Sequence, residues 1–187
     1  MMASTYPTSL DTFTNPTATS LLTSPSHAQQ HSDINDAVEA LETKVAIGNT
    51  VLGVYQSYTP TWTNLTIGNA TQDFYWARVN NLVHVVGVMT FGTTTSLTGN
   101  PLIISVPVTA SSRYSTSFAL YGIAVAYDLS AATNYEGVGM AGSTTGARLR
   151  IINTAGTYAA QNNITTTIPF TWTTGDVIGV NFTYEAA

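Results

Sequence analysis

The chain of 187 residues has three histidines and no cysteine, so few of its side chains could bind a metal or move a proton. His27 and His31 are four positions apart, and in a helix this spacing places both side chains on one face. The pair resembles half of a zinc-protease helix, but the intervening AQQ holds no glutamate and no third ligand is evident. His84 lies in the apolar run LVHVVGV, where its expected face partners Leu82 and Val86 supply no orienting carboxylate. We interpret His84 as an ordinary histidine of a sheet or interface.

The acidic residues do not form a recognisable catalytic pair. A helix-forming stretch holds Asp33, Asp36, Glu39 and Glu42, which we interpret as a solvated helix surface. The residues mostly beside turns or ends, where carboxylates commonly accept backbone N–H bonds, are Asp73, Asp128, Asp176 and Glu185. No nucleophile elbow, P-loop or dinucleotide fingerprint occurs. We predict that the protein is not an enzyme and uses no cofactor. A glycan-degrading enzyme would require two carboxylates facing each other in a groove.

Charge is scarce throughout the chain. Only 8% of residues are charged, against about a quarter in a typical soluble chain, and the formal net charge is −5. The arginines do not cluster, so we expect neither nucleic-acid binding nor a polybasic membrane patch. No apolar run reaches membrane-spanning length, and the stretch MMASTYPTSL lacks the features of a secretory signal. We therefore expect no membrane insertion and no signal peptide.

Residues 54–187 have the composition of a β domain, rich in Thr, Val, Asn and Gly and broken by turn signals such as Asn80-Asn81. Short strands at regular spacing without alternating helices predict an antiparallel β-sandwich or jelly roll. The continuous apolar run VHVVGVMTF predicts a strand buried on both faces. Expected strands are 58–67, 72–79, 82–91, 102–106, 115–127, 135–141, 147–153, 166–172 and 177–184.

The aromatic residues of this domain allow two interpretations. Core and cross-strand packing is the favoured one, and a sugar-binding face is the alternative. An exposed Tyr75 or Tyr158 would bear more on sugar binding than the tryptophans. The aromatic residues concerned are Trp62, Phe74, Tyr75, Trp76, Tyr114, Tyr121, Tyr127, Tyr135, Tyr158, Trp172 and Tyr184.

Residues 24–46 form the one good helix pattern in the sequence. Ser24 could cap it with Pro25 at the first helical position, or the helix could begin at Ser32 or Asp33. Gly48 supplies a stop signal, and 47–53 would be a linker. Its apolar residues alternate in spacings of four and three, the a/d pattern of a coiled coil, and the same frame includes both histidines. The predicted seam is His27, His31, Ile34, Val38, Leu41 and Val45.

This narrow seam favours association with copies of itself over packing on the β domain. β-Branched residues at both a and d positions favour three chains, so we predict a homotrimer. In a trimer His27 and His31 would form two rings around the axis. We favour polar layers that fix the helix register, with an axial metal or anion as the alternative.

Residues 1–23 carry no sustained period, and Pro7 and Pro16 would break a helix. Two interpretations stay open: a solvated chain end, or an arm that becomes ordered against a partner surface. The residues of the expected attachment arm are Tyr6, Pro7, Leu10, Phe13, Leu21 and Leu22.

The stretch TYPTSLDTFTNPTATSLLTSPSHAQQHSDINDAVEALETKV (5–45) resembles the N-termini of many virion proteins of tailed bacteriophages. There a similar Y-P-x-S-L-D…P-S-H…Q-H…N-D-A-V-x-A-L segment precedes diverse β domains. The stretch PFTWTTGDVIGVNFTYEA (169–186) more loosely resembles closing strands of phage fibre and head-decoration domains.

This resemblance implies a modular homotrimer whose arm attaches to the virion and whose β domain is displayed. The small size fits a capsid decoration protein or short head fibre, a minor capsid protein on the capsid exterior that is made in the host cytoplasm. Its partners would be further copies of itself and the major capsid protein or another virion protein. The alternative is a tail-associated receptor-binding protein whose β domain binds a host surface glycan.

Overall fold

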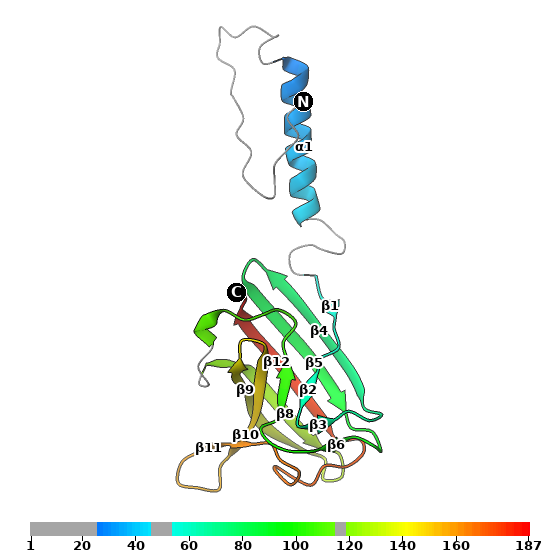
Figure 1. Cartoon of the computed structure of the whole chain (residues 1–187), viewed down its shortest axis with the longest axis vertical. Coiled ribbons are helices and arrows are strands. Elements are labelled where there is room, and N and C mark those ends of the chain that lie inside the picture. Colours follow the sequence, from blue (N-terminus) through cyan, green and yellow to red (C-terminus); the bar gives the residue numbers. More distant parts are fainter. Residues whose placement is uncertain (1–25, 46–53, 115–118) are drawn as a thin grey trace. The chain divides into compact units, whose positions relative to one another are not determined.

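The computed structural model describes residues 26–45, 54–114 and 119–187, in two compact units, 1–54 and 55–187. In the first unit the described structure is helix α1 (His27–Val45), shown in blue in Figure 1. Ser26 caps it, because the backbone N–H of Gln29 donates to Ser26 Oγ at 3.1 Å and that of Gln30 to the Ser26 carbonyl at 3.0 Å. The predicted helix is confirmed, but neither predicted start is correct. Ser26 satisfies the first free N–H groups, and Gly48 lies outside the described residues.

The second unit is mainly β, and its long strands are antiparallel neighbours (Figure 1). Their bounds are β4 (Thr71–Val79), β5 (Leu82–Thr90), β8 (Leu120–Asp128), β9 (Thr133–Ser143), β10 (Gly146–Asn153) and β12 (Val177–Glu185). The shorter elements are β1 (Gln56–Ser57), β2 (Trp62–Thr63), β3 (Leu65–Thr66), β6 (Ser96–Leu97), β7 (Ile103–Ser105), β11 (Ala160–Asn163) and the 3-10 helix η1 (Ser112–Tyr114). Strand order in the main sheet is β1-β4-β5-β12-β8-β9-β10-β7-β2, with β11 on β10, while β3 and β6 form a separate pair.

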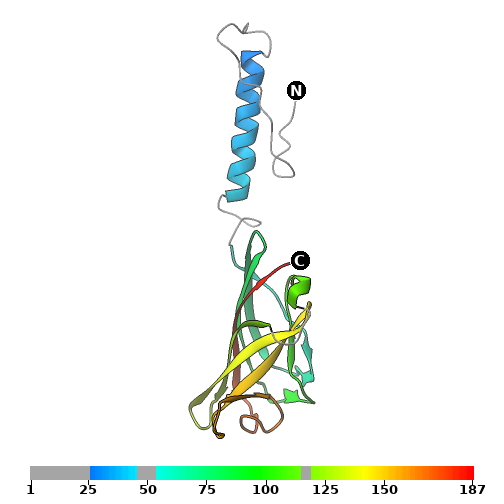
Figure 2. The same ribbon diagram turned by 90° about the vertical axis from the view of Figure 1, so that its left-hand side faces the viewer.

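The main sheet curls on itself. Its two end strands, β1 and β2, are joined directly by residues 58–61, which can span at most about 18 Å between Ser57 and Trp62. The two ends of the strand order must therefore approach each other. The indole Nε1 of Trp62 donates to Gln72 Oε1 at 2.7 Å. This bond joins the end strand β2 to β4, the neighbour of the other end strand β1. Figure 2 shows the resulting curled, strongly twisted sheet from the side.

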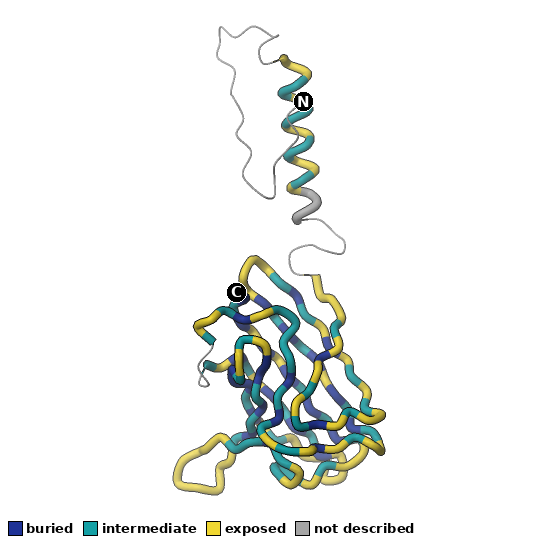
Figure 3. The backbone as a smooth tube through the Cα atoms, viewed as in Figure 1, coloured by how far each residue is buried: buried dark blue, intermediate teal, exposed yellow. Residues whose placement is uncertain are grey.

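The inner face of the curled sheet holds the hydrophobic core (dark blue in Figure 3). Two glycines allow aromatic rings to lie flat against the sheet. A Cβ at Gly139 would lie 2.1 Å from Phe182 Cε1, and one at Gly87 would lie 2.3 Å from Phe74 Cδ1. The largest fully buried side chains are Tyr184, Phe74, Phe182, Met89, Leu102, Ile104, Leu149, Ile164, Ile178, Val83, Val85 and Asp176.

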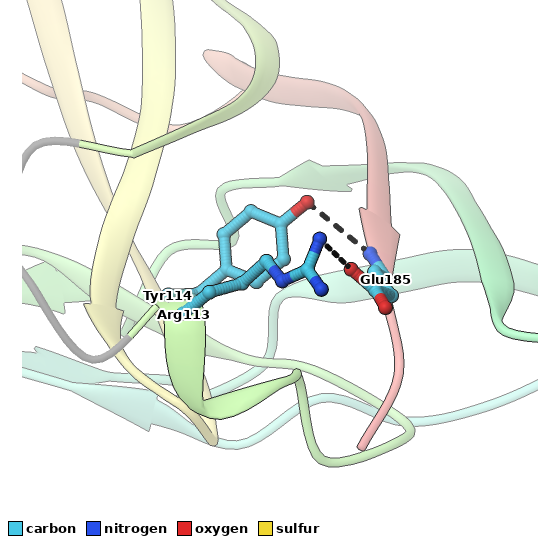
Figure 4. Close-up of polar contacts among 3 residues, drawn as sticks. All are labelled: Arg113, Tyr114 and Glu185. Carbon is cyan, nitrogen blue, oxygen red and sulfur yellow. Dashed lines mark hydrogen bonds and ion pairs between the residues drawn. The ribbon is translucent and has the colours of Figure 1, made fainter.

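The last strand is held from outside the sheet by the segment that contains η1. Arg113 Nη1 lies 2.9 Å from Glu185 Oε2, and the backbone N–H of Glu185 donates to Tyr114 Oη at 3.4 Å (Figure 4). The N–H of Ser111 also donates to the Glu185 carbonyl at 2.8 Å. These contacts fix the end of β12 although the ion pair itself, with Arg113 73% exposed, contributes little.

Several sequence predictions need correction. The mainly β, antiparallel class is confirmed, but a sandwich or jelly roll is not, because the long strands form one continuous curled sheet. The Asn80-Asn81 hairpin joins β4 to β5 as predicted, with Asn80 at φ 52°. The strand predicted at 166–172 is absent: only an isolated bridge between Thr165 and Ile168 forms there. β5 is not buried on both faces, because Val88 on its outer face is 44% exposed.

Candidate assembly site

The predicted attachment arm lies in the part of the chain that the structure does not describe. All of its residues belong to positions 1–25, so the interpretation of the arm stays a prediction. They are Tyr6, Pro7, Leu10, Phe13, Leu21 and Leu22.

The predicted seam, by contrast, falls within α1. At about 100° per residue its six positions occupy an arc of about 80° and extend over about 27 Å of helix. Ile34, Val38 and Leu41 are 52%, 47% and 50% exposed. The rings of His27 and His31 are also exposed, at the start of the same stripe. Val45 ends the helix, and its side chain is not described.

The faces of α1 beside and opposite the seam are polar. Gln29 Nε2 donates to Asp33 Oδ1 at 2.6 Å. These two residues are about one helical turn apart, on the side of α1 away from the seam. A helix of this length is marginal alone in water, so most of its stability must come from burial of its apolar stripe. Each half-exposed apolar side chain would contribute on the order of 1 kcal/mol if a partner covered it. The exposed stripe is therefore an apolar surface of the described chain that is suited to association.

His27 and His31 are brought together as their spacing predicts. Their Nε2 atoms are 2.9 Å apart, and the rings meet edge to face with centroids 4.5 Å apart at 67°. The nitrogens are closer than the ring centres, so each Nε2 lies on the side of its ring that faces the other. At least one ring is neutral in this contact, because a hydrogen bond needs an acceptor as well as a donor.

Comparison with protein-family models, with curated proteins and with solved structures returns no match. The chemistry of the site must therefore be argued from its own residues. Among the described residues no three or more His, Cys, Asp or Glu side chains gather as a metal site. None of the described helices is long and apolar enough to cross a membrane.

On the outer face of the sheet, His84 is held from two sides. Tyr55 Oη lies 2.5 Å from His84 Nδ1, and His84 Nε2 lies 2.9 Å from Asn181 Oδ1. Asn181 Oδ1 can only accept, so His84 Nε2 carries the proton of this hydrogen bond. Sequence reasoning missed both partners because they are 29 and 97 positions away, and no spacing pattern signals such contacts. The arrangement anchors Tyr55, the first residue of the β unit, to β5 and β12.

Most of the aromatic residues named from the sequence lie in the core or pack against it, as the packing interpretation predicts. Phe74, Tyr121 and Tyr184 lie in the core. Tyr55, Tyr75 and Tyr158 are 50%, 41% and 85% exposed, and two of these were singled out from the sequence. Ser57 pairs with Tyr75, and Tyr75 pairs with Val86. Residues paired in an antiparallel sheet point to one face, so Tyr75 shares the outer face with Val86.

Two acidic side chains are structural. Asp176 is fully buried, and its carboxylate accepts the backbone N–H of Leu129 at 3.0 Å and that of Thr173 at 2.5 Å. Asp128 accepts from Ser130 Oγ at 2.7 Å and the N–H of Ala131 at 3.0 Å, and these bonds lower the pKa of its carboxyl.

An open depression of about 390 Å³ lies beside β9, β10 and β11. Its lining includes Tyr135, Ile151, Asn153, Asn162 and Pro169 and contains no acidic or histidine side chain. It lacks the facing carboxylates that glycoside hydrolysis requires.

Proposed function

We propose that this protein is a non-enzymatic structural protein of a tailed-bacteriophage virion. In this proposal α1 joins three chains as a short coiled coil, the arm binds the capsid, and the β domain is displayed on the capsid exterior. The observation that carries the proposal is the exposed stripe of Ile34, Val38 and Leu41 on a helix whose described side chains form no other apolar face. Such a stripe needs a partner, and a copy of the same helix offers the matching surface.

The virion part of the proposal is supported by residues 5–45, whose pattern resembles attachment segments of phage virion proteins. The sequence order of arm, helix and β domain gives each part a separate role, with the arm for attachment, the helix for registration of three chains and the β domain for display. A compact chain of 19.8 kDa suits a capsid decoration protein or short head fibre.

The oligomer is tested by light scattering coupled to size-exclusion chromatography of the full chain. We expect three times the chain mass of 19.8 kDa. Val38→Asp or Leu41→Asp should reduce the mass to that of one chain, because a carboxylate at the seam would have to be desolvated. Ala40→Asp is the matched control, since it places the same carboxylate about 100° from Leu41 and about 160° from Val38 around the helix. A wild-type monomer, or two seam variants with unchanged mass, would refute the assembly model.

The attachment role is tested by deletion of residues 1–23. The truncated chain should still form a trimer but should not be incorporated into virions. Incorporation is measured from the protein content of purified particles. Normal incorporation would contradict the arm model. Labelling of the protein on particles would place it on the head or on the tail.

A second candidate is a tail-associated protein that binds a host glycan through the β domain. The observation that favours it is the exposure of Tyr55 and Tyr75 on the outer face that also holds Asn181. Tyr55 bonds His84, which bonds Asn181, and Tyr75 and Asn181 both pair with Val86. Sugars stack on aromatic rings and bond to amides. Glycan-array binding by the full chain, lost in Tyr75→Ala and retained in Tyr158→Ala, would support this function. Absence of binding to a broad glycan array would refute this second function.

A further inference from the structure

We propose that His27 and His31 form a binding site for a late first-row divalent metal ion such as Ni²⁺ or Cu²⁺ on the surface of α1. The site is made by one helix of one chain, so it goes beyond the assembly proposed above and does not require it. The starting observation is that the two exposed imidazoles of His27 and His31 bring their Nε2 atoms to within 2.9 Å of each other.

The geometry fits two cis ligands of one metal ion. Imidazole nitrogens bind such ions at about 2.0–2.1 Å. Two nitrogens 2.9 Å apart at that distance subtend an angle of about 90° at the metal. This is the angle between neighbouring ligands in octahedral and square-planar coordination, the geometries typical of Ni²⁺ and Cu²⁺. No backbone movement is needed, because the spacing of the two residues along the helix already sets the separation.

The ligand type selects the class of ion. Neutral imidazole suits borderline ions such as Ni²⁺, Cu²⁺ and Zn²⁺, whereas Ca²⁺ and Mg²⁺ require oxygen ligands. Each neutral imidazole binds a metal ion through Nε2 with its proton on Nδ1, so the proton that the two Nε2 atoms now share would move to Nδ1 of the same ring. Protonation of either ring removes a ligand, so metal binding should weaken as the pH is lowered.

Two features limit the affinity. Among the described residues no further His, Cys, Asp or Glu completes a group of three with this pair, so water would fill the other coordination positions in a single chain. His27 also lies in the first turn of α1, where the positive end of the helix dipole opposes a cation. We expect a weak chelate in one chain. In the proposed trimer three such pairs would lie at one level of the helices, and a shared ion would bind more tightly.

The test is calorimetric titration of the metal-free full chain with NiCl₂ at neutral pH. His31→Ala should weaken Ni²⁺ binding by about tenfold or more, because the second imidazole then no longer binds within the same molecule. His84→Ala should leave the affinity unchanged. The decisive control is the double variant Gln29→His with His31→Ala. It keeps the number of histidines but turns one of them by about 160° around the helix, and should bind as weakly as His31→Ala.

The inference fails if the double variant binds Ni²⁺ as tightly as the wild type, or if His84→Ala loses as much affinity as His31→Ala. Light scattering on the same samples separates this inference from the assembly model. A monomer whose Ni²⁺ binding depends on both histidines would refute the trimer and support the site. A trimer whose Ni²⁺ affinity is unchanged in His31→Ala would support the assembly model and refute the site.

Discussion

Removal of the buried carboxylate of Asp176 should destabilise the β domain more than any change at an exposed acid. The side chain joins the turn after β8 to the loop before β12, through Leu129 and Thr173. Three donors reach it: two backbone N–H groups and, at 3.2 Å, Thr173 Oγ1. Asp176→Ala leaves all three without this acceptor.

The magnitude follows from these three bonds. Hydrogen bonds to a charged group contribute about 1.5–3 kcal/mol each, but Leu129 and Thr173 are exposed residues, so water can replace part of the loss. We expect Asp176→Ala to lower the free energy of unfolding by about 2–4 kcal/mol. Asp176→Asn keeps one acceptor oxygen and should cost about half as much.

The assay is urea denaturation followed by tryptophan fluorescence. Asp73→Ala is the control, because Asp73 is an exposed acid on β4 of the same sheet, and its effect should stay within about 0.5 kcal/mol. An Asp176→Ala variant within that same range would refute the role assigned to the carboxylate. An Asp176→Asn variant as unstable as Asp176→Ala would show that charge, and not the number of acceptors, decides the effect.

Three further predictions concern the core. Tyr184→Phe should cost about 1–2 kcal/mol in the same denaturation assay, because Tyr184 Oη bonds both the carbonyl and the N–H of Val108, at 2.8 and 3.3 Å. Gly139→Ala should cost about 3 kcal/mol or prevent folding, since its Cβ would lie 2.1 Å from a Phe182 ring carbon, and full stability would contradict the packing described. Burial raises the pKa of Tyr121 to about 12, while a tyrosine of the unfolded chain ionises near 10. The contribution of neutral Tyr121 to stability should therefore be fully present below pH 10 and be lost as the pH rises from about 10 to 12. A melting temperature that does not change over this pH range would count against this.

Local patterns predicted the features that depend on neighbours in sequence. The apolar spacing located α1, and Asn80-Asn81 located a hairpin because asparagine tolerates the positive φ that the turn requires. The prediction failed where distant segments decide the outcome. Residues 166–172 have the composition of a strand but form none, whereas the polar strand β11 (Ala160–Asn163) pairs with β10. Propensity describes what a segment tolerates, and the available sheet edge decides whether it pairs.

The curl of the sheet and the partners of His84 were beyond sequence reasoning for the same reason. The curl follows from the pairing of β1 with β4 and of β2 with β7, which no periodicity reports. The contact between His84 and Asn181 depends on the register of β12 against β5, where Thr183 is the residue opposite His84. The alternation of side chains along a strand indicates which residues share a face, but not which residues lie opposite them on the next strand.

The place of β12 in the sheet has a consequence for biosynthesis. β12 is the last described strand in the chain, yet it lies between β5 and β8 in the middle of the strand order. While the ribosome is still making residues 177–185, neither half of the sheet has its central neighbour, and Met89 and Ala126 lack the partner residue Ile178 that joins them. The β domain can therefore complete its fold only after this strand is released, whereas α1 is made early and folds through local contacts. If three nascent chains meet through α1, they do so before their β domains close, so assembly can precede folding.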